Sequence, residues 1–300
     1  MTAQTTLDAD RSSARTDPRT ATTTVTGDRR LAYAEYGPFT GDPVVFLHGT
    51  PGSRRLAALF DALARDTDHR IVAPDRPGYG LSAPWPDRTI ADGSRVVRAV
   101  LDHAGVDTAR IVAFSGGAPS AFAAATALPD RTERVDVVAG VTPPEYAAER
   151  PAVQRALSAL GSTAPPALGA LLRAQRWLAT RRGPSFVASQ YTTGDPSDAV
   201  SDRAAELVRE DFLEALSRHR SGAVTEFRHA AADWDVDLGT IDAPVRFWHG
   251  ADDANVPIGG VRRFAAALRT ARLEEFDDAD HLQTLLRAVP AILGAGESPA

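Results

Sequence analysis

Short apolar runs alternate with segments of helical periodicity along most of this chain, and this alternation limits the fold more than any other feature. Four runs have the continuous apolar character of strands buried on both faces. They cover residues 43–49, 71–75, 110–114 and 136–141. Helical spacing of apolar residues fills the segments between them, at 54–66, 94–106 and 118–128. Short links between alternating strands and helices imply right-handed crossovers, so the sequence predicts an α/β fold with a mostly parallel sheet.

Further strands flank this central series. TTTVT and LAYAEYG precede it and are separated by Gly27 and Asp28, which is a hairpin signal. PVRFWHG, at residues 244–250, and ARLEEF follow it. The sequence therefore predicts eight strands with helices on both faces of the sheet. In such sheets the chemistry is found at the carboxyl ends of the strands.

The alternation stops at Pro143 and Pro144, and the segment that follows has helical periodicity without a buried strand. An insertion over the carboxyl edge of a sheet usually covers a site. We therefore expect three parts: a disordered polar lead-in at 1–20, a core domain formed by 21–142 and 241–300, and a helical cap at 143–240.

The composition excludes several kinds of chemistry. All 33 positively charged side chains are Arg, because the sequence contains no Lys, and it contains no Cys. A Schiff-base or phosphate-loop lysine, a thiol nucleophile, a Cys-ligated metal and disulfides are therefore impossible. The formal net charge of −6 argues against nucleic acid or an anionic membrane as an obligate partner. The N-terminus lacks the apolar region of a secretory signal, so we expect a cytoplasmic protein.

The sharpest motif is VAFSGG, where a predicted strand meets a predicted helix at Ser115. A serine on such a turn is held in strained geometry with its hydroxyl exposed above the sheet. Ala113 and Gly117 supply the small flanking residues that the turn requires, although the usual pattern G-x-S-x-G has Gly where Ala113 stands. Ser115 is a candidate nucleophile, and the alternative is a serine that caps a helix N-terminus.

A nucleophilic serine needs a histidine base and an acid that orients the histidine. Of the seven histidines, His281 is the candidate base, because it follows the strand ARLEEF and opens the last predicted helix. His48 and His249 are expected to pack under their strand-end loops. Asp252 and Asp253 follow the strand PVRFW, where a carboxylate can reach the imidazole of His281. The alternative is a turn built by the aspartate side chains.

The loop HGTPGS follows the strand PVVFL. Acyl transfer needs backbone N–H groups aimed at a developing oxyanion. The amides of Thr50, in this loop, and of Gly116, after the candidate nucleophile, are the natural pair. Gly49 and Gly52 permit the loop to turn its amides inward.

In its motifs and their order, the chain resembles the α/β-hydrolase superfamily. The matching segments are HGTPGS, DRPGYGLS, VAFSGGAPSA, HGADDANVP and DADH, and the helical cap stands where that family inserts one. The resemblance covers about residue 21 to the C-terminal helix. It implies the α/β-hydrolase fold and no metal or organic cofactor.

The resemblance also implies roles for individual residues. Ser115 would be the nucleophile, Asp253 the acid and His281 the base, with the spacing from Gly250 to Pro257 favouring Asp253 over its neighbour. Some relatives carry the acid one strand earlier, near Glu145. The segment DRPGYGLS resembles a mainly structural element, which assigns Asp75 and Arg76 no catalytic role. Epoxide hydrolases and haloalkane dehalogenases of this superfamily use Asp where this chain has Ser115, which argues against both activities.

The cap contributes five large aromatic side chains, which we expect mainly to form its core. They are Trp177, Phe186, Tyr191, Phe212 and Trp234. A subset can line a pocket, and Trp177 and Tyr191 are the candidate substrate-binding residues.

The function that this sequence favours is a serine hydrolase acting on a small or medium ester, lactone or related acyl compound. The same fold also supports C–C bond hydrolysis, peptidase activity, and acyl transfer or cyclisation. A non-catalytic binding protein with a hydrolase fold is an alternative of another class. The expected partner is a small-molecule substrate, and the sequence leaves the oligomeric state open, a homodimer included.

Overall fold

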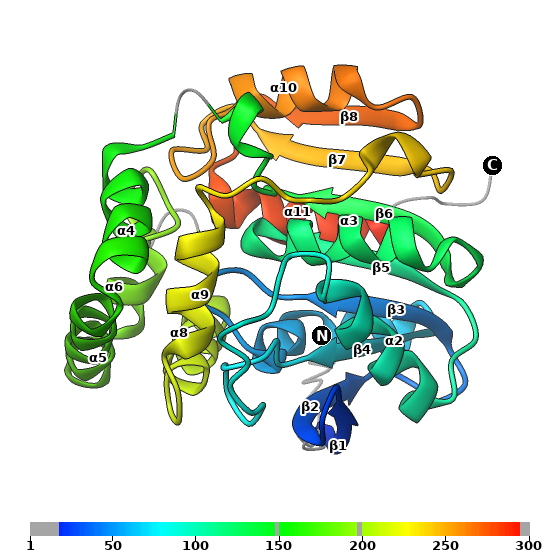
Figure 1. Ribbon diagram of the computed structural model, residues 1–300, viewed down its shortest axis with the longest axis horizontal. Helices are drawn as coiled ribbons and strands as arrows, with labels where there is room; N and C mark the ends of the chain where they lie inside the picture. The colour runs from blue at the N-terminus through cyan, green and yellow to red at the C-terminus, as the bar shows by residue number, and fades with distance from the viewer. Residues whose placement is uncertain (1–17, 148–149, 197–199, 295–300) are drawn as a thin grey trace, which may run out of the picture.

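An eight-stranded sheet forms the centre of the computed structural model, which describes residues 18–147, 150–196 and 200–294 (Figure 1). The strands are β1 (Arg19–Val25), β2 (Arg29–Tyr36), β3 (Asp42–Leu47), β4 (His69–Pro74), β5 (Ala109–Phe114), β6 (Thr132–Val138), β7 (Val245–Gly250) and β8 (Ala271–Phe276). Their order is β1-β2-β4-β3-β5-β6-β7-β8. β2 pairs antiparallel with β1 and with β4, and the remaining pairs are parallel. The predicted eight-stranded, mostly parallel sheet is confirmed.

The sequence of each strand reflects its place in the sheet. β4 is buried at every position, and β3, β5 and β6 are buried over the four residues that lead to their carboxyl ends. Strands covered on both faces have continuous apolar runs, which is why these segments are recognisable in the sequence. β1 lies at the edge, is exposed or half-buried up to its last residue, and consists largely of Thr.

Helices cover both faces of the sheet, as the sequence predicts. α2 (Gly93–Ala104), α3 (Ala118–Ala127) and α10 (Ile258–Ala267) contribute Val97, Phe122 and Phe264 to one buried apolar cluster. α11 (His281–Ile292) contributes Leu285 to a second cluster, which also contains Phe60. The two clusters are the cores on either side of the sheet.

The segment predicted as one helix at 54–66 consists of two short elements. A 3₁₀ helix, η1 (Arg54–Phe60), is followed by α1 (Asp61–Asp66), and Phe60 between them has φ −115° and ψ 6°. Apolar spacing alone does not separate the two helix types, because both repeat every three to four residues.

The segment between β6 and β7 contains the helices α4 (Ala152–Thr163), α5 (Pro165–Arg181), α6 (Pro184–Ala188), α8 (Asp202–Ala215) and α9 (Ser221–His229). We call residues 143–240 the helical insertion. Figure 1 shows these helices beyond the carboxyl ends of the parallel strands. The insertion therefore lies at the edge where the sequence places the candidate catalytic residues.

Two further observations concern the described residues as a whole. None of their helices is both long and apolar enough to cross a membrane. Most of the predicted lead-in, residues 1–17, lies outside the described part of the chain, and β1 begins at Arg19.

Candidate active site

Ser115 stands at a sharp turn between β5 and α3. Its φ angle is +51°, in the left-handed region that a non-glycine residue rarely adopts. A Cβ on Gly117 would lie 2.6 Å from the carbonyl oxygen of Leu47, so the backbone of the turn packs directly against β3. The N-cap of α3 is Gly117, without a side-chain cap bond, so Ser115 is not the capping serine that the alternative required. Ala113 fits in the fully buried end of β5.

Asp253 and His281 form a buried pair. The Nδ1–H of His281 donates to Oδ2 of Asp253 over 2.7 Å, and the two residues are 4% and 1% exposed. His281 is the first residue of α11, and its position is fixed by a capping box between Asp280 and Gln283. With Nδ1 engaged by a carboxylate, Nε2 is the nitrogen that remains free to accept a proton.

The loop after β7 holds the Asp253 carboxylate in place. Its Oδ1 accepts from the backbone amides of Asn255 and Val256, both over 2.8 Å. Burial alone would raise the pKa of Asp253, but His281, His249 and the Val256 amide together lower it below its ordinary value. Asp252 is exposed and its amide donates to the carbonyl of Ala279. Of the two neighbouring aspartates, Asp253 is the one that contacts His281.

His249 adds a second imidazole beside the same carboxylate. Its Nε2 lies 2.8 Å from the carbonyl oxygen of Val256 and 3.4 Å from Oδ2 of Asp253. The residue is fully buried, and burial lowers its pKa, so the ring is neutral at pH 7. The sequence placed His249 under its loop, where it is found, but did not indicate the contact with Asp253.

The surroundings of His281 link it to the turn at Ser115. The ring of Phe114 lies 4.9 Å from that of His281, and the ring of Tyr191 stacks on His281 at 6.2 Å. Ser115 and Tyr191 line the same small cavity. Within the described residues, no hydrogen bond joins Ser115 Oγ to His281. Such bonds are often long in structures without substrate and tighten on binding.

Thr50 and Gly116 are in direct contact. A Cβ on Gly116 would lie 2.1 Å from Oγ1 and 3.3 Å from the backbone nitrogen of Thr50. Glycine is therefore required at position 116. The loop after β3 and the turn after β5, whose amides the sequence predicts as oxyanion donors, therefore lie next to each other.

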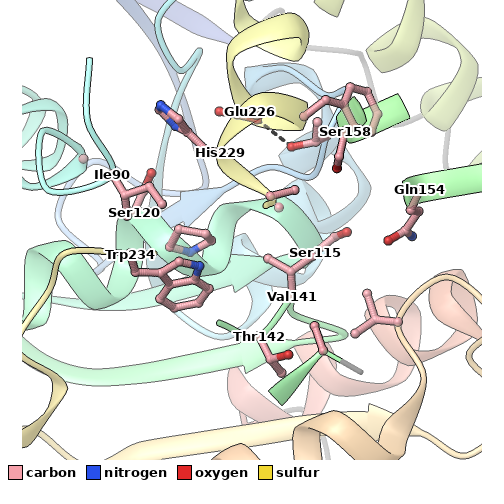
Figure 2. Close-up of a pocket in the computed structure, with 18 of the residues that line it drawn as sticks. Ile90, Ser115, Ser120, Val141, Thr142, Gln154, Ser158, Glu226, His229 and Trp234 are labelled. Atoms are coloured by element: carbon pink, nitrogen blue, oxygen red, sulfur yellow. Dashed lines mark hydrogen bonds between the residues drawn. The ribbon is translucent and has the colours of Figure 1, made fainter. Parts of the chain in front are cut away.

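A half-buried carboxylate that sequence reasoning missed contacts Thr50. Glu226, in α9, accepts from Oγ1 of Thr50 over 2.5 Å and from the hydroxyl of Tyr79 over 2.7 Å. Figure 2 shows its side chain at the wall of a cavity that also contains Ser115. Glu226 also pairs with Arg76 and Arg88 over 2.8 and 2.9 Å. Burial alone would raise the pKa of Glu226, but the two guanidinium groups hold it well below its ordinary range. Arg76, assigned no catalytic role, is 2% exposed within this cluster.

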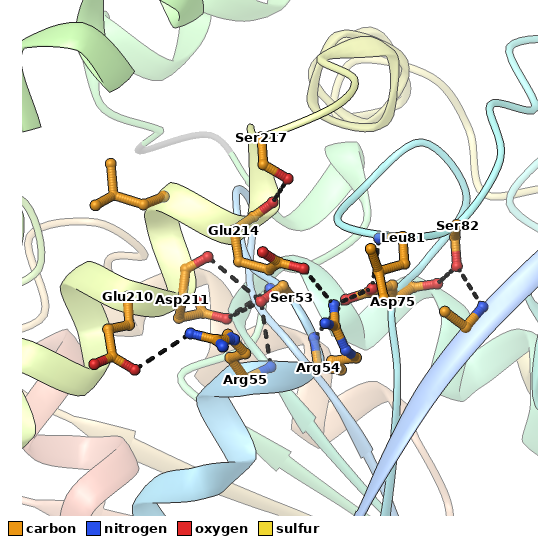
Figure 3. Close-up of polar contacts among 12 residues, drawn as sticks. Ser53, Arg54, Arg55, Asp75, Leu81, Ser82, Glu210, Asp211, Glu214 and Ser217 are labelled. Atoms are coloured by element: carbon orange, nitrogen blue, oxygen red, sulfur yellow. Dashed lines mark hydrogen bonds and ion pairs between the residues drawn. The ribbon is translucent and has the colours of Figure 1, made fainter. Parts of the chain in front are cut away.

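A second polar cluster joins the insertion to the loop after Thr50 (Figure 3). Oδ1 of Asp211, in α8, accepts from both the amide and the hydroxyl of Ser53, over 2.8 and 2.7 Å. Arg54 bridges Asp75 and Glu214, each over 2.7 Å. Burial raises the pKa of Asp211 to about 7, although the Ser53 bonds oppose the shift.

Two cavities meet at Ser115. The larger, of about 140 Å³, extends between the sheet edge and helices α4 and α9 (Figure 2). The smaller lies toward Tyr191 and Asp211. A volume near 150 Å³ holds a benzene ring in an engineered protein cavity, so the larger cavity suits a small or medium ligand.

The two candidate substrate-binding residues have different positions. Tyr191 is half-buried and lines the smaller cavity. Trp177 is 52% exposed on α5, with the guanidinium of Arg181 3.9 Å from its ring, and it lines neither cavity. Helical spacing could not separate the two, because it does not specify which face of α5 is covered. Glu145, the alternative acid, is exposed.

A metal site is not indicated by the described residues, which contain no group of three or more His, Asp or Glu side chains arranged to hold an ion.

Comparison with known proteins places the chain in a family. Its residues 42–288 match the family model described as alpha/beta hydrolase fold. It is 29% identical over 251 residues to a putative carbamate hydrolase from Caulobacter sp. (strain K31), covering 76% of this chain and 84% of that protein. It is also 29% identical to a 2-hydroxy-6-oxononadienedioate/2-hydroxy-6-oxononatrienedioate hydrolase from Cupriavidus pinatubonensis, over 80% of each chain. Other matches are partial, such as one that spans 36% of an uncharacterised hydrolase from Bacillus subtilis.

Solved structures extend the comparison to the whole fold. A bromoperoxidase from Bacillus anthracis superimposes with a TM-score of 0.71 at 19% identity, over 92% of this chain and 98% of that one. At this identity the similarity concerns the fold alone. Because the family model matches well over half of the sequence, this chain belongs to the alpha/beta hydrolase fold family.

Proposed function

We propose that this protein is a serine hydrolase that cleaves a small or medium ester, lactone or related acyl compound. The observation that carries the proposal is the buried pair of Asp253 and His281 beside a serine held at positive φ. The relatives that align over most of this chain are named as hydrolases, which supports the reaction class.

The proposed reaction has two halves. Nε2 of His281 takes the proton of Ser115 as Oγ attacks the carbonyl carbon, and the same proton then passes to the leaving alcohol. In the second half, water gives a proton to Nε2 of His281 as it attacks the carbonyl carbon of the acyl-enzyme. His281 then returns that proton to Oγ of Ser115 as the acid is released. Asp253 holds the imidazole in the tautomer that accepts at Nε2 and stabilises its charged form.

The oxyanion is assigned to the amides of Thr50 and Gly116. Preorganised donors of this kind contribute several kcal/mol of transition-state stabilisation, roughly 3–4 for a single donor. The contact of Glu226 with Thr50 Oγ1 positions the loop from the insertion side. In this proposal the insertion acts as a cap that shapes the pocket, while the reacting groups belong to the core.

A fluorophosphonate probe tests the nucleophile directly, because it reacts with activated serines. We expect the wild-type protein to be labelled and Ser115→Ala to be unlabelled, with kcat for short-chain 4-nitrophenyl esters lowered by about 10⁴ or more. Ser120→Ala, a change at another serine of the larger cavity, should keep its labelling. An unlabelled wild-type protein would favour the non-catalytic alternative, and labelling that survives Ser115→Ala would move the nucleophile elsewhere.

C–C bond hydrolysis is the second candidate, and the match to the Cupriavidus pinatubonensis enzyme favours it. That protein's name describes a hydrolase of an oxo-dienedioate. A product screen with esters, lactones and vinylogous diketones separates the candidates, because only a C–C hydrolase releases two fragments from the diketone.

A further inference from the structure

Three polar side chains of the insertion face the larger cavity at intervals of four residues. Arg150 precedes α4, and Gln154 and Ser158 follow on that helix. All three line the cavity that contains Ser115. A spacing of four residues places Gln154 and Ser158 on one face of α4, while Arg150 lies outside the helix and reaches the same cavity from the segment that leads into it. We call Arg150, Gln154 and Ser158 the α4 polar stripe.

Two members of the stripe have hydrogen-bonding capacity that the described residues leave unused. The hydroxyl of Ser158 is buried without a partner, in a residue that is 3% exposed. The guanidinium of Arg150 makes neither a hydrogen bond nor an ion pair within the described part of the chain. Burial lowers the pKa of Arg150, though it remains charged at pH 7. A buried polar group normally has a partner, so the Ser158 hydroxyl indicates a missing one, and the half-buried guanidinium of Arg150 offers donors in the same cavity.

Gln154 closes one side of the stripe. Its Nε2 donates to the carbonyl oxygen of Asn255 over 2.5 Å, and Asn255 in turn donates to the carbonyl oxygen of Gln190 over 3.0 Å. These bonds tie α4 to the loop that carries Asp253. α4, with Gln154 and Ser158, is thus held next to the loop of the proposed acid.

The described residues that line the cavity carry a positive net charge. Its lining residues include Arg76, Arg88 and Arg150, and Glu226 is the single acid among those that the structure describes there. Glu226 is shared by Arg76 and Arg88, so it does not neutralise Arg150. Burial lowers the pKa of His229, another lining residue, to about 4, which leaves it neutral. The free positive charge at the stripe favours an anion.

The other side of the cavity carries apolar side chains together with Ser120 and the neutral His229. Ile90, Val96 and Trp234 line it, and Figure 2 shows Ile90 and Trp234 on one side of Ser115 with Gln154 and Ser158 on the other. A ligand that satisfies both sides has an apolar body and a charged acceptor at one end. The planar guanidinium fork matches a carboxylate, which accepts two parallel N–H bonds.

We propose that the α4 polar stripe is a carboxylate subsite, so that the preferred substrates are esters bearing a carboxylate a short apolar chain away from the scissile bond. Half-esters of short dicarboxylic acids have this form. The inference rests on the proposed function, because it assumes a substrate whose reacting carbonyl lies at Ser115. It adds that the carboxylate at the other end of that substrate binds at the stripe.

A matched pair of substrates tests the subsite. Mono-4-nitrophenyl adipate carries the carboxylate, and its distal methyl ester has the same chain without the charge. We expect wild-type kcat/KM to be at least about tenfold higher for the acid, as a charge-assisted pair predicts. Arg150→Gln should bring the ratio close to one, and Arg150→Lys should keep part of the preference. Arg182→Gln, at an exposed arginine after α5 and outside both cavities, removes the same charge and should leave the ratio unchanged.

A binding measurement separates this inference from the proposed reaction. Monomethyl adipate should bind Ser115→Ala in calorimetry, and adding Arg150→Gln should weaken its Kd by about tenfold or more. Hydrolysis of both esters with an equal ratio in wild type and Arg150→Gln overturns the subsite but leaves the hydrolase intact. Absence of hydrolysis and of fluorophosphonate labelling overturns the proposed function, while Arg150-dependent binding would still support the subsite. Binding that is unaffected by Arg150→Gln contradicts it in either case.

Discussion

Asp252 and Asp253 are neighbours of the same chemistry with different surroundings, and they offer a comparison at the scale of one residue. Asp253→Asn should lower kcat by up to about 10⁴, because an amide facing Nδ1 of His281 favours the tautomer that cannot accept at Nε2. Asp252→Asn should change kcat little, since that side chain is exposed. Ester hydrolysis by both folded variants checks this. A larger loss from Asp252→Asn would mean that the acid is assigned to the wrong residue.

Tyr191 and Trp177, the two candidate substrate-binding residues, allow a second comparison, between a side chain that lines a cavity and one that is exposed. Tyr191→Ala enlarges the smaller cavity beside Ser115, so it makes room for a longer acyl chain. The ratio of kcat/KM for hexanoate over acetate esters should therefore rise by roughly tenfold, the size of effect that an extra methylene has in an apolar pocket. Trp177→Ala should leave the ratio at the wild-type value, because the ring is exposed. Chain-length profiles of the two variants provide the measurement. Equal profiles would show that the smaller cavity does not receive the acyl chain.

Individual residues also show where sequence reasoning stops. Ser115 and His281 follow recognisable strands, and chemistry at the carboxyl ends of strands is a general property of such sheets. Asp253 could be separated from Asp252 only through the family resemblance. Glu226 lies 176 residues from Thr50 along the chain, and no local pattern indicates that contact. The place of Arg150 in the cavity could not be predicted from the sequence either, because an arginine before a helix is ordinarily exposed to solvent.

At the scale of elements, α9 is joined to the core through a buried charge cluster. Glu226→Gln leaves Arg76 and Arg88 buried without their counter-charge, which should lower the free energy of unfolding by roughly 3–5 kcal/mol. The matched control is Glu210→Gln in α8, whose ion pair with Arg55 at 3.4 Å is largely exposed. That change should cost less than about 1 kcal/mol. Urea unfolding of both variants measures the two losses in unfolding free energy. Equal losses would contradict the predicted difference between Glu226 and Glu210.

The elements themselves were largely predictable. Continuous apolar runs indicate the buried strands, and Gly105 ends α2 in the left-handed conformation that glycine favours. The division of residues 54–66 into η1 and α1 was not predictable from periodicity. The packing of α8 and α9 on the loop after β3 depends on tertiary contacts that become visible only once the chain is folded.

For the whole molecule, Asp211 couples stability to pH. Its folded-state pKa of about 7 exceeds the ordinary value near 3.9, so the folded protein binds more protons between these pH values. Its contribution to stability is therefore complete below about pH 4 and is lost as pH rises through about 7. Asp211→Asn is neutral throughout, so its stability relative to wild type should improve from pH 5 to pH 8, by on the order of a few kcal/mol. Urea unfolding at the two pH values checks this, and a constant difference would refute it.

The insertion leaves the sheet after β6 and rejoins it at β7, and these two strands are hydrogen-bonded neighbours. A graft could therefore exchange the whole insertion for that of another family member without changing the strand order. Its two acidic anchors restrict the choice of donor, because Asp211 and Glu226 hold Ser53 and Thr50 of the recipient. A chimera that lacks both acids would leave the loop at Thr50 and Ser53 without these contacts. A graft that keeps this loop in its place thus requires donor helices that carry carboxylates at these two positions.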